Sequence, residues 1–432
     1  MLLSFYGDDF TGSTDVMESM SLHGVKTVLF TRIPSGAEQA RFGGYDAIGI
    51  AGTSRSQSPQ WMDEHLPRHF AWLKSLGARV CHYKVCSTFD SAPHVGSIGR
   101  AIEIGRRVFG QSITPLVVGA PQLKRYTAFG HLFAGYQGGT YRIDRHPVMS
   151  RHPVTPMDEA DLRLHLARQT ALPVDLVPIT ALNDAAVDTV IDAATGIVLF
   201  DVMDLATQIE TGRQLLRLVP RLGPFVAGSS GVNYALVKAL AAGAASFPAL
   251  PKAERIIAVS GSCSPTTARQ IRHALAHGFA GLHADPLALA GADADAAIAG
   301  LSVEAGRLLG EGRSVIVYTA LDPEMDRGGL LDAIPGGRHR VGQGLGRIAR
   351  SCIEAFGLTR AILAGGDTSS HALGELDVFA LTTRFPLAAT PGSPLCTAAS
   401  ADPKLDGLEI AMKGGQVGGD DYFVALRDGR AA

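Results

Sequence analysis

The sequence predicts an α/β protein of two domains, each a mostly parallel sheet flanked by helices, with a cleft between the domains. Three observations support this prediction. The chain has 432 residues, more than a single hydrophobic core usually serves. Short apolar runs alternate with longer helical patterns, as in parallel sheets covered on both faces. The alternation stops at residues 243–252, where small residues and two prolines are typical of a domain boundary. We therefore expect domains over residues 1–245 and 252–432.

In the first domain, seven short runs rich in β-branched or large apolar residues predict strands. They cover residues 2–6, 27–30, 47–50, 79–84, 116–119, 197–201 and 224–227. Helical patterns lie between them at residues 13–23, 60–75, 95–108 and 158–169. In the second domain, we expect strands at 256–259, 314–318, 361–364 and 408–412, and helices at 266–277, 293–311 and 346–356.

Charge and composition exclude several classes of partner. The net charge is -2, which gives no electrostatic reason to expect nucleic acid or an anionic membrane as partner. The first residues carry no basic segment before their apolar run ends at Asp8, and no run approaches the length of a membrane span. The five cysteines form no CxxC pair, which favours reduced thiols over a zinc site. We expect a cytoplasmic protein that acts on a small molecule.

Two adjacent carboxylates, Asp8 and Asp9, directly follow the first predicted strand. Ligands of open α/β sheets bind beyond the carboxyl ends of the strands. Neighbouring carboxylates repel each other, and such a pair can hold a metal, orient a hydroxyl or remove its proton. The alternative is that an Asp or Thr caps a helix that starts near Ser13. The second carboxylate and the flanking glycines favour a functional role.

A second group of polar residues follows other strands of the first domain. Lys84 ends a predicted strand and precedes Ser87 and Asp90, an arrangement that fits an anion pocket. A solvated lysine at a sheet edge is the alternative. Arg55 also follows a strand and could bind a carboxylate through two hydrogen bonds, although a surface salt bridge fits it equally well. His152, in a loop between prolines, is either a substrate contact or a structural residue.

Three loops of the second domain are suited to phosphate. They follow predicted strands, contain glycines and hydroxyls, and would let backbone N–H groups approach phosphate oxygens. Their candidate nucleotide-binding residues are Ser260, Ser262, Gly365, Gly366, Asp367, Thr368, Gly415 and Gly418. The chain contains neither a Walker A loop nor a GxGxxG fingerprint, and each loop alone is a weak signal. Three together in one domain favour a nucleotide site.

These motifs resemble the four-carbon acid sugar kinase family, in order and over essentially the whole chain. The sequence Gly-Asp-Asp-Phe-Thr-Gly at residues 7–12 matches the opening signature of that family. Further similar segments are residues 84–91, 152–157, 228–231, 260–264, 365–369 and 413–418. The last glycine loop departs from the usual family sequence, and the segment 141–151 is longer than usual. The acid is therefore open between 3-oxo-tetronate, threonate and the branched 3-oxo-isoapionate.

The resemblance implies an ATP-dependent kinase that phosphorylates a hydroxyl of a small sugar acid. Asp8 and Asp9 would orient and deprotonate the hydroxyl, and the sugar acid would be bound by Arg55, Lys84, Ser87, Asp90 and His152. ATP would occupy the C-terminal domain, with Mg²⁺ bridging its phosphates through protein ligands that the sequence does not identify. A homo-oligomer is possible. The competing hypothesis is a non-catalytic sensor that binds a sugar acid and a nucleotide.

Overall fold

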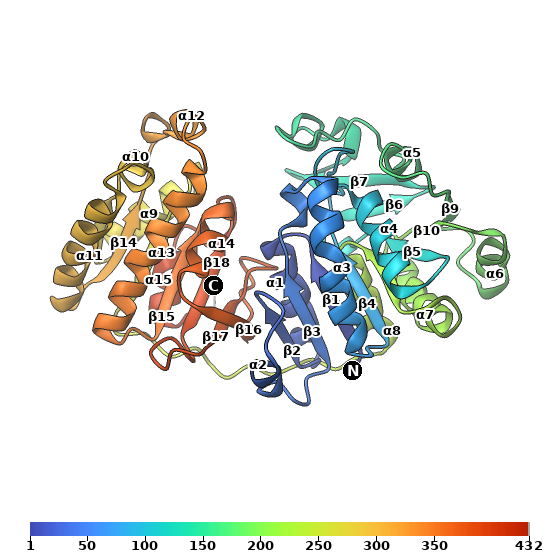
Figure 1. Cartoon of the computed structure of the whole chain (residues 1–432), viewed down its shortest axis with the longest axis horizontal. Coiled ribbons are helices and arrows are strands. Elements are labelled where there is room, and N and C mark those ends of the chain that lie inside the picture. Colours follow the sequence, from blue (N-terminus) through green and yellow to red (C-terminus); the bar gives the residue numbers. More distant parts are fainter. Residues whose placement is uncertain (431–432) are drawn as a thin grey trace. The chain divides into compact units, whose positions relative to one another are not determined.

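The computed structural model describes residues 1–430 and confirms the predicted α/β class. The chain divides into two compact units, Met1–Ala245 and a second that begins at Ser246, and each is described by itself (Figure 1). Within the second unit, Arg384 donates hydrogen bonds to the carbonyls of Pro248 and Ala249, which fixes the start of this unit. No helix among residues 1–430 is long and apolar enough to cross a membrane.

The first unit is built on a parallel sheet. Its strands lie in the order β2 (Thr27–Phe30), β3 (Ala47–Ala51), β1 (Leu3–Gly7), β4 (Val80–Lys84), β11 (Phe225–Gly228), β5 (Thr114–Val117), β10 (Ile197–Phe200) and β9 (Val174–Val177). In the register, Gly7 lies opposite both Ala51 and Lys84, and Lys84 lies opposite Gly228. The carboxyl ends of β3, β1, β4 and β11 therefore meet at one edge of the sheet.

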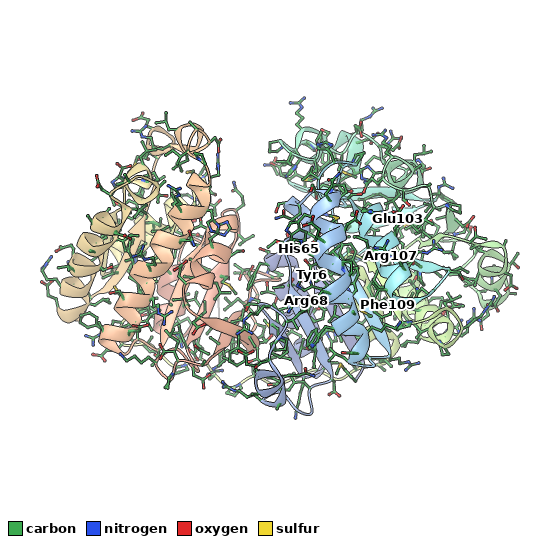
Figure 2. All side chains as sticks on the ribbon, viewed as in Figure 1. Tyr6, His65, Arg68, Glu103, Arg107 and Phe109 are labelled. Carbon is green, nitrogen blue, oxygen red and sulfur yellow. The ribbon has the colours of Figure 1, made fainter. Side chains whose placement is uncertain are left out.

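Helices cover both faces of this sheet. α3 (Pro59–Ser75) and α4 (Ile98–Phe109) pack together on the face that carries Tyr6, which stacks edge-on against Phe70. Figure 2 labels Tyr6 on β1 and the exposed His65 and Arg68 on the outer side of α3. Alternate strand residues point to the other face. There α1 (Phe10–Leu22) and α7 (Leu205–Leu222) pack with α8 (Gly231–Ala239).

A small antiparallel sheet of the first unit was not predicted. It consists of β6 (Arg125–Ala128), β7 (His131–Tyr136) and β8 (Gly139–Arg142). Its strands are short, but they contain Tyr, Thr and Phe, which are enriched in strands, so the sequence carried a β signal that the prediction missed. Only Leu132 and Ala134 of β7 are buried in the main core. The expected helix at 158–169 is reduced to α5 (Leu162–Ala167), because Asp161 caps its first turn.

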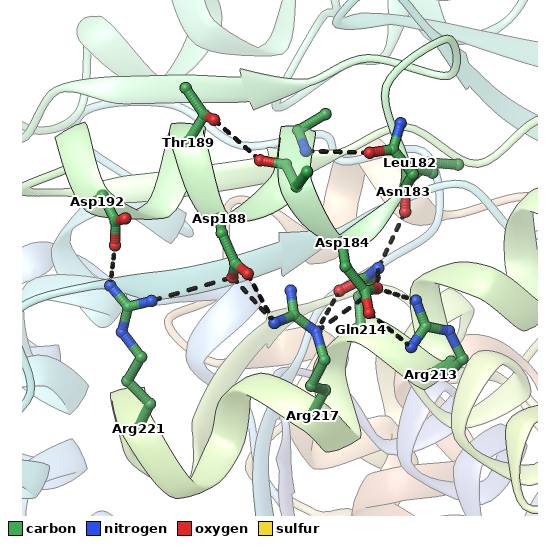
Figure 3. A network of polar contacts seen from close by, with 12 residues as sticks. Leu182, Asn183, Asp184, Asp188, Thr189, Asp192, Arg213, Gln214, Arg217 and Arg221 are labelled. Atoms are coloured by element: carbon green, nitrogen blue, oxygen red, sulfur yellow. Dashed lines mark hydrogen bonds and ion pairs between the residues drawn. The ribbon is translucent and has the colours of Figure 1, made fainter.

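An acidic and a basic row align α6 (Asp184–Ala193) with α7 (Figure 3). Three aspartates spaced four residues apart on α6 face three arginines with the same spacing on α7. The pairs are Arg213–Asp184, Arg217–Asp188 and Arg221–Asp192. All six side chains are partly exposed, and exposed ion pairs contribute little stability. Arg217 and Arg221 also lie within ion-pair distance of the preceding aspartates, Asp184 and Asp188. A shift by one helical turn would therefore keep two of the three pairs, so the row lines the contact between the helices but does not by itself set their register.

The second unit contains a mixed sheet. Its strands lie in the order β13 (Phe279–His283), β14 (Ser314–Tyr318), β12 (Ile257–Ser260), β15 (Arg360–Ala364), β18 (Glu409–Lys413), β17 (Leu395–Ser400) and β16 (Val378–Phe385). The first five run parallel, and β17 is antiparallel to both neighbours. Ser260, Ala364 and Lys413 lie side by side. The three glycine-bearing loops thus leave the sheet at one edge.

Helices again cover both faces of this sheet. α9 (Pro265–Ala276) and α15 (Tyr422–Asp428) share one core, while α11 (Ala294–Gly310), α13 (Gly337–Phe356) and α14 (Gly366–Gly374) pack together elsewhere. α13 begins nine residues before its predicted start. Glycine is unfavourable inside helices, so the glycines of α13 argued against a helix in the sequence. In the structure they allow the backbone of α13 to pack closely on α14. A Cβ at Gly346 would lie 2.6 Å from the carbonyl oxygen of Ala372.

Candidate active site

The predicted sugar-acid residues come together at the carboxyl edge of the first sheet. The loops after β1, β3 and β4 are joined by backbone hydrogen bonds. The Asp8 amide donates to the Lys84 carbonyl at 2.8 Å, and the Arg55 amide donates to the Asp8 carbonyl at 3.0 Å. These bonds hold Asp8, Arg55 and Lys84 in one cluster, although they are up to 76 residues apart in the sequence.

Arg55 bridges two carboxylates in this cluster. Its Nη1 lies 2.6 Å from Oδ2 of Asp9, and its Nη2 lies 2.9 Å from Oδ2 of Asp90. The Asp90 side chain is almost completely buried, whereas 28% of the Asp9 side chain is exposed. Asp9 is therefore the carboxylate of this pair that a ligand can reach.

Asp9 also caps α1, which confirms the capping interpretation of this part of the sequence. Its Oδ1 accepts the Gly12 amide hydrogen at 2.6 Å, and the helix begins at Phe10 rather than near Ser13. A Cβ at Gly12 would lie 2.6 Å from that oxygen and 2.8 Å from the ammonium nitrogen of Lys84. Glycine at this position lets the carboxylate and the ammonium group approach the same backbone.

Hydrogen bonds fix Asp90 from several directions. Its carboxylate accepts from Thr88 at 2.5 Å and from Thr155 at 3.1 Å. Thr155 in turn lies 3.0 Å from Nδ1 of His152. Burial alone would raise the pKa of Asp90, but Arg55 and the Thr88 hydroxyl lower it below its usual range. The carboxylate is therefore held in its charged form, and His152 is connected to the cluster through Thr155.

Backbone strain shapes the turn that carries Thr88 and Asp90. Phe89, between them, has a φ of +57°, which is uncommon for a bulky residue. Such conformations persist where the surroundings impose them, and they cluster at functional sites. Ser87 lies half-buried at the start of this turn, and none of the hydrogen bonds among residues 1–430 joins its side chain to the carboxylate cluster.

Asp8 lies deeper than Asp9. Burial and, next, the charge of Asp9 raise its pKa to about 7, although Arg55 and Lys84 oppose the shift. Its Oδ1 is buried, and no described group forms a hydrogen bond with it. The carboxyl group of Asp8 therefore changes charge near neutral pH.

Lys84 is the buried cation of the cluster. Its Nζ donates to the Val85 carbonyl at 2.8 Å, and its side chain is almost inaccessible. Asp15, one helical turn and a half beyond Asp9, is also buried, and it accepts hydrogen bonds from Ser230 and Tyr234. Burial raises the pKa of Asp15, and the charge of Lys84 opposes this shift. Among the described residues, Lys84 forms no direct ion pair, although its charge acts on Asp8 and Asp15.

The pKa of Asp8 predicts a pH dependence. As the pH rises through about 7, Asp8 loses its proton and adds a negative charge beside Asp9, which favours proton acceptance by the site. We expect kcat/KM for the sugar acid to rise with pH and level off above about 7. The same shift predicts that the stability contributed by protonated Asp8 is lost as the pH rises through 7.

Asp8→Asn tests this assignment, because the amide cannot titrate. The variant should lack the rise near pH 7, and its melting temperature relative to wild type should increase as the pH goes from 4 to 8. A rise of unchanged position in Asp8→Asn would assign the titration to another group. The measurements are pH–rate profiles and thermal unfolding over the same pH range.

The second unit contains a pocket of about 210 Å³ at the carboxyl edge of its sheet. Four of the predicted nucleotide-binding residues line it, namely Ser262, Gly365, Gly366 and Thr368. Gly365 has a φ of +112°, which a side chain rarely permits, and α14 begins directly after it. The helix start offers unpaired N–H groups to the pocket, which suits phosphate oxygens.

Other predicted residues support the pocket without lining it. Ser260 is fully buried, and its hydroxyl accepts the Ser262 amide hydrogen at 3.4 Å. A Cβ at Gly415 would lie 2.7 Å from the Ser262 hydroxyl, so glycine allows the two loops to touch. Gly418, with a φ of +92°, lies at a turn whose carbonyls are bound by Gln270. The side chain of Asp367 lies outside the described part of the structure.

Several residues of both sites were not predicted. Thr88 and Thr155 were missed because a threonine hydroxyl carries no distinctive sequence pattern. Arg327 and Arg338 line the nucleotide pocket, but they belong to a segment that the sequence analysis assigned to no element. Lys413 ends β18, and burial lowers its pKa to about 8. Its ammonium group donates to Thr267, and Thr267 donates to the Gly415 carbonyl, so Lys413 stabilises the loop that contains Gly415. The sequence signal for this role was a lysine at the end of a strand.

The described residues of the pocket suit a metal ion that is coordinated mainly by phosphate oxygens and water. They include no group of three or more His, Cys, Asp or Glu side chains placed to bind a metal. Asp326 is the one described carboxylate that lines the pocket. Mg²⁺ is commonly bound by one or two carboxylates together with substrate phosphates and water, so Asp326 is a suitable contributor.

Family comparisons match both units. Residues 3–236 match the model of a sugar-binding N-terminal domain, and residues 257–423 match the model of a nucleotide-binding C-terminal domain. The chain is 47% identical, over its whole length and 95% of the relative, to a 3-oxo-isoapionate kinase of Paraburkholderia graminis. It is 30% identical to a 3-oxo-tetronate kinase of Cupriavidus necator, over 98% of this chain and 95% of that protein.

Solved structures share the fold. A Salmonella typhimurium LT2 protein superposes with a TM-score of 0.78 at 23% identity, over 98% of both chains. A Haemophilus influenzae protein of a domain family of unknown function superposes with a TM-score of 0.75 at 23% identity, over 98% of this chain and 99% of that one.

Proposed function

We propose that this chain, which belongs to the four-carbon acid sugar kinase family, transfers a phosphoryl group from ATP to a hydroxyl of 3-oxo-isoapionate. The chain is a sugar-acid kinase, and its domains have the matching sugar-binding and nucleotide-binding types. The observation that carries the choice of substrate is the 47% identity to a 3-oxo-isoapionate kinase over the full chain, against 30% to a 3-oxo-tetronate kinase.

In this proposal the first unit orients the sugar acid. Asp9, the accessible carboxylate held by Arg55, accepts a hydrogen bond from the reacting hydroxyl and takes its proton. Lys84 supplies positive charge for the substrate carboxylate, together with Arg55, which pairs with Asp9 and Asp90 in the free enzyme. Ser87 and His152 complete the binding surface, and the buried Asp90 holds Arg55 in position. The arrangement performs no covalent chemistry, as phosphoryl transfer requires mainly positioning and charge stabilisation.

The second unit is proposed to bind ATP in the pocket bordered by Ser262, Gly365, Gly366 and Thr368. Backbone N–H groups at the start of α14 would bind phosphate oxygens. Mg²⁺, with Asp326 as one protein ligand, would neutralise part of the phosphate charge. Ser260, Gly415 and Gly418 hold the surrounding loops in place.

Replacing Lys84 tests the carboxylate site. We expect Lys84→Met to raise KM for the sugar acid roughly 10- to 100-fold, the range expected when a charge-assisted hydrogen bond is lost. Wild type should have a higher KM for an analogue that carries an alcohol in place of the carboxylate than for the acid. This difference should disappear in Lys84→Met. Arg55→Met should raise KM as well, with an added loss in kcat because Asp9 loses its partner. A Lys84→Met enzyme that prefers the acid over the alcohol as strongly as wild type would place Lys84 elsewhere.

The substrate is tested by comparing kcat/KM for 3-oxo-isoapionate, 3-oxo-tetronate and threonate with ATP and Mg²⁺. We expect 3-oxo-isoapionate to have the highest value. A higher value for 3-oxo-tetronate would overturn the proposed substrate while leaving the kinase activity intact. Omission of Mg²⁺ should abolish turnover with every acid.

A further inference from the structure

The nucleotide pocket has two kinds of lining. Glycines and hydroxyl residues on one side offer backbone N–H and O–H donors, but none of these groups carries a charge. A triphosphate carries several negative charges, and enzymes that bind it usually supply cations as well. The basic side chains that line the described pocket are Arg327 and Arg338.

Arg338, which lines the pocket, pairs its guanidinium fork with a neighbouring carboxylate. It is the second residue of α13, and its Nε and Nη2 lie 2.7 and 3.0 Å from the two oxygens of Asp332. The two side chains are 60% and 59% exposed, and ion pairs with such exposure contribute little. The guanidinium group of Arg338 can therefore leave Asp332 for two phosphate oxygens at low cost.

Arg338 is better placed for this role than Arg327. The backbone of Arg338 belongs to a helix of 20 residues that packs closely on α14, whose first residue, Gly366, lines the same pocket. Arg327 precedes the four-residue α12 (Gly328–Leu331) and donates to the carbonyl of Glu324. The planar fork of arginine binds phosphate through two parallel hydrogen bonds, which a lysine cannot reproduce.

We propose that Arg338 exchanges Asp332 for the phosphate chain of ATP when the nucleotide occupies the pocket. Asp332 then acts as a substitute anion that keeps the guanidinium in place in the free enzyme. This inference rests on the proposed nucleotide site, but it does not depend on the identity of the sugar acid. It assigns a phosphate-binding cation to a site whose other predicted ligands carry no positive charge.

The test is calorimetry of the full-length chain without sugar acid, using a non-hydrolysable ATP analogue with Mg²⁺ and, separately, inorganic tripolyphosphate. Arg338→Met should weaken both probes by on the order of 10- to 100-fold, the effect of losing a charge-assisted pair. Asp332→Asn should tighten both by about two- to fivefold, because the competing ion pair is gone. Arg347→Met is the matched control, since Arg347 lies on the same helix in an exposed pair with Asp295 and does not line the pocket.

The opposite signs of the two variants separate this role from a structural one. If the Arg338–Asp332 pair only stabilised the loop, both variants would weaken binding, and that result would overturn the proposal. Unchanged binding by Arg338→Met would also overturn it. A loss confined to the ATP analogue, with tripolyphosphate unaffected, would place Arg338 at the nucleoside instead. Because no sugar acid is present, an incorrect substrate assignment leaves this result unaffected.

Discussion

Asp9→Asn should lower kcat by roughly 10²–10⁴-fold, the usual span for loss of a general base, while the affinity for ATP stays nearly unchanged. The amide cannot accept the hydroxyl proton, and it no longer carries the charge that pairs with Arg55 at 2.6 Å. It can still cap α1 through its side-chain oxygen, so the fold should be maintained. The measurements are steady-state kinetics with the sugar acid and calorimetry with an ATP analogue.

Two controls define this result. Asp63→Asn removes another partly exposed aspartate of the first unit, paired with Arg100, and should keep full turnover. Asp8→Asn should keep more activity than Asp9→Asn and should lose only the pH dependence near 7. A larger loss in Asp8→Asn than in Asp9→Asn would transfer the role of base to Asp8. Full turnover in Asp9→Asn would remove Asp9 from the reaction.

Gly366→Val should weaken ATP binding by roughly 100-fold or more and leave sugar-acid binding unchanged. Gly366 lines the pocket at the start of α14, and an added Cβ would meet no atom within 4 Å. The new side chain therefore fits the folded protein and occupies space that phosphate needs to reach the backbone N–H groups. Substitution at Gly365 would be less informative, because its positive φ adds backbone strain.

Gly374→Val is the matched control for this variant. Gly374 ends the same helix, an added Cβ there also meets nothing within 4 Å, and the residue does not line the pocket. Its affinity for ATP should equal that of wild type. Calorimetry with each ligand separately gives the answer, and loss of acid binding with intact ATP binding in Gly366→Val would contradict the assignment of ATP to the second unit.

The grouping of the site residues could be predicted because it follows from strand ends. Asp9, Arg55 and Asp90 each lie shortly after a strand, and β1, β3 and β4 are adjacent and parallel. Strand order itself was not read from the sequence. Parallel topology alone places these loops at one edge, which was enough to predict that these side chains lie close together.

The contacts of each residue within the cluster could not be predicted, because they join segments that are far apart in the sequence. Arg55 was expected to bind substrate directly, and the structure adds that it holds Asp9 and Asp90. The positive φ of Phe89 follows from tertiary packing rather than from residue type. The start of α13, and with it Arg338, was missed because glycines that allow close helix packing look like helix breakers.

The most direct test of the account is ADP release from ATP and Mg²⁺ in the presence and absence of 3-oxo-isoapionate. We expect negligible ADP without the acid and, with it, one ADP for each acid phosphorylated. Asp9→Asn and Gly366→Val should each abolish most of this release, the first with ATP still bound and the second with the acid still bound. Binding of both ligands by the wild-type chain without any ADP release, for this acid or its tetronate relatives, would contradict the account and indicate a sensor.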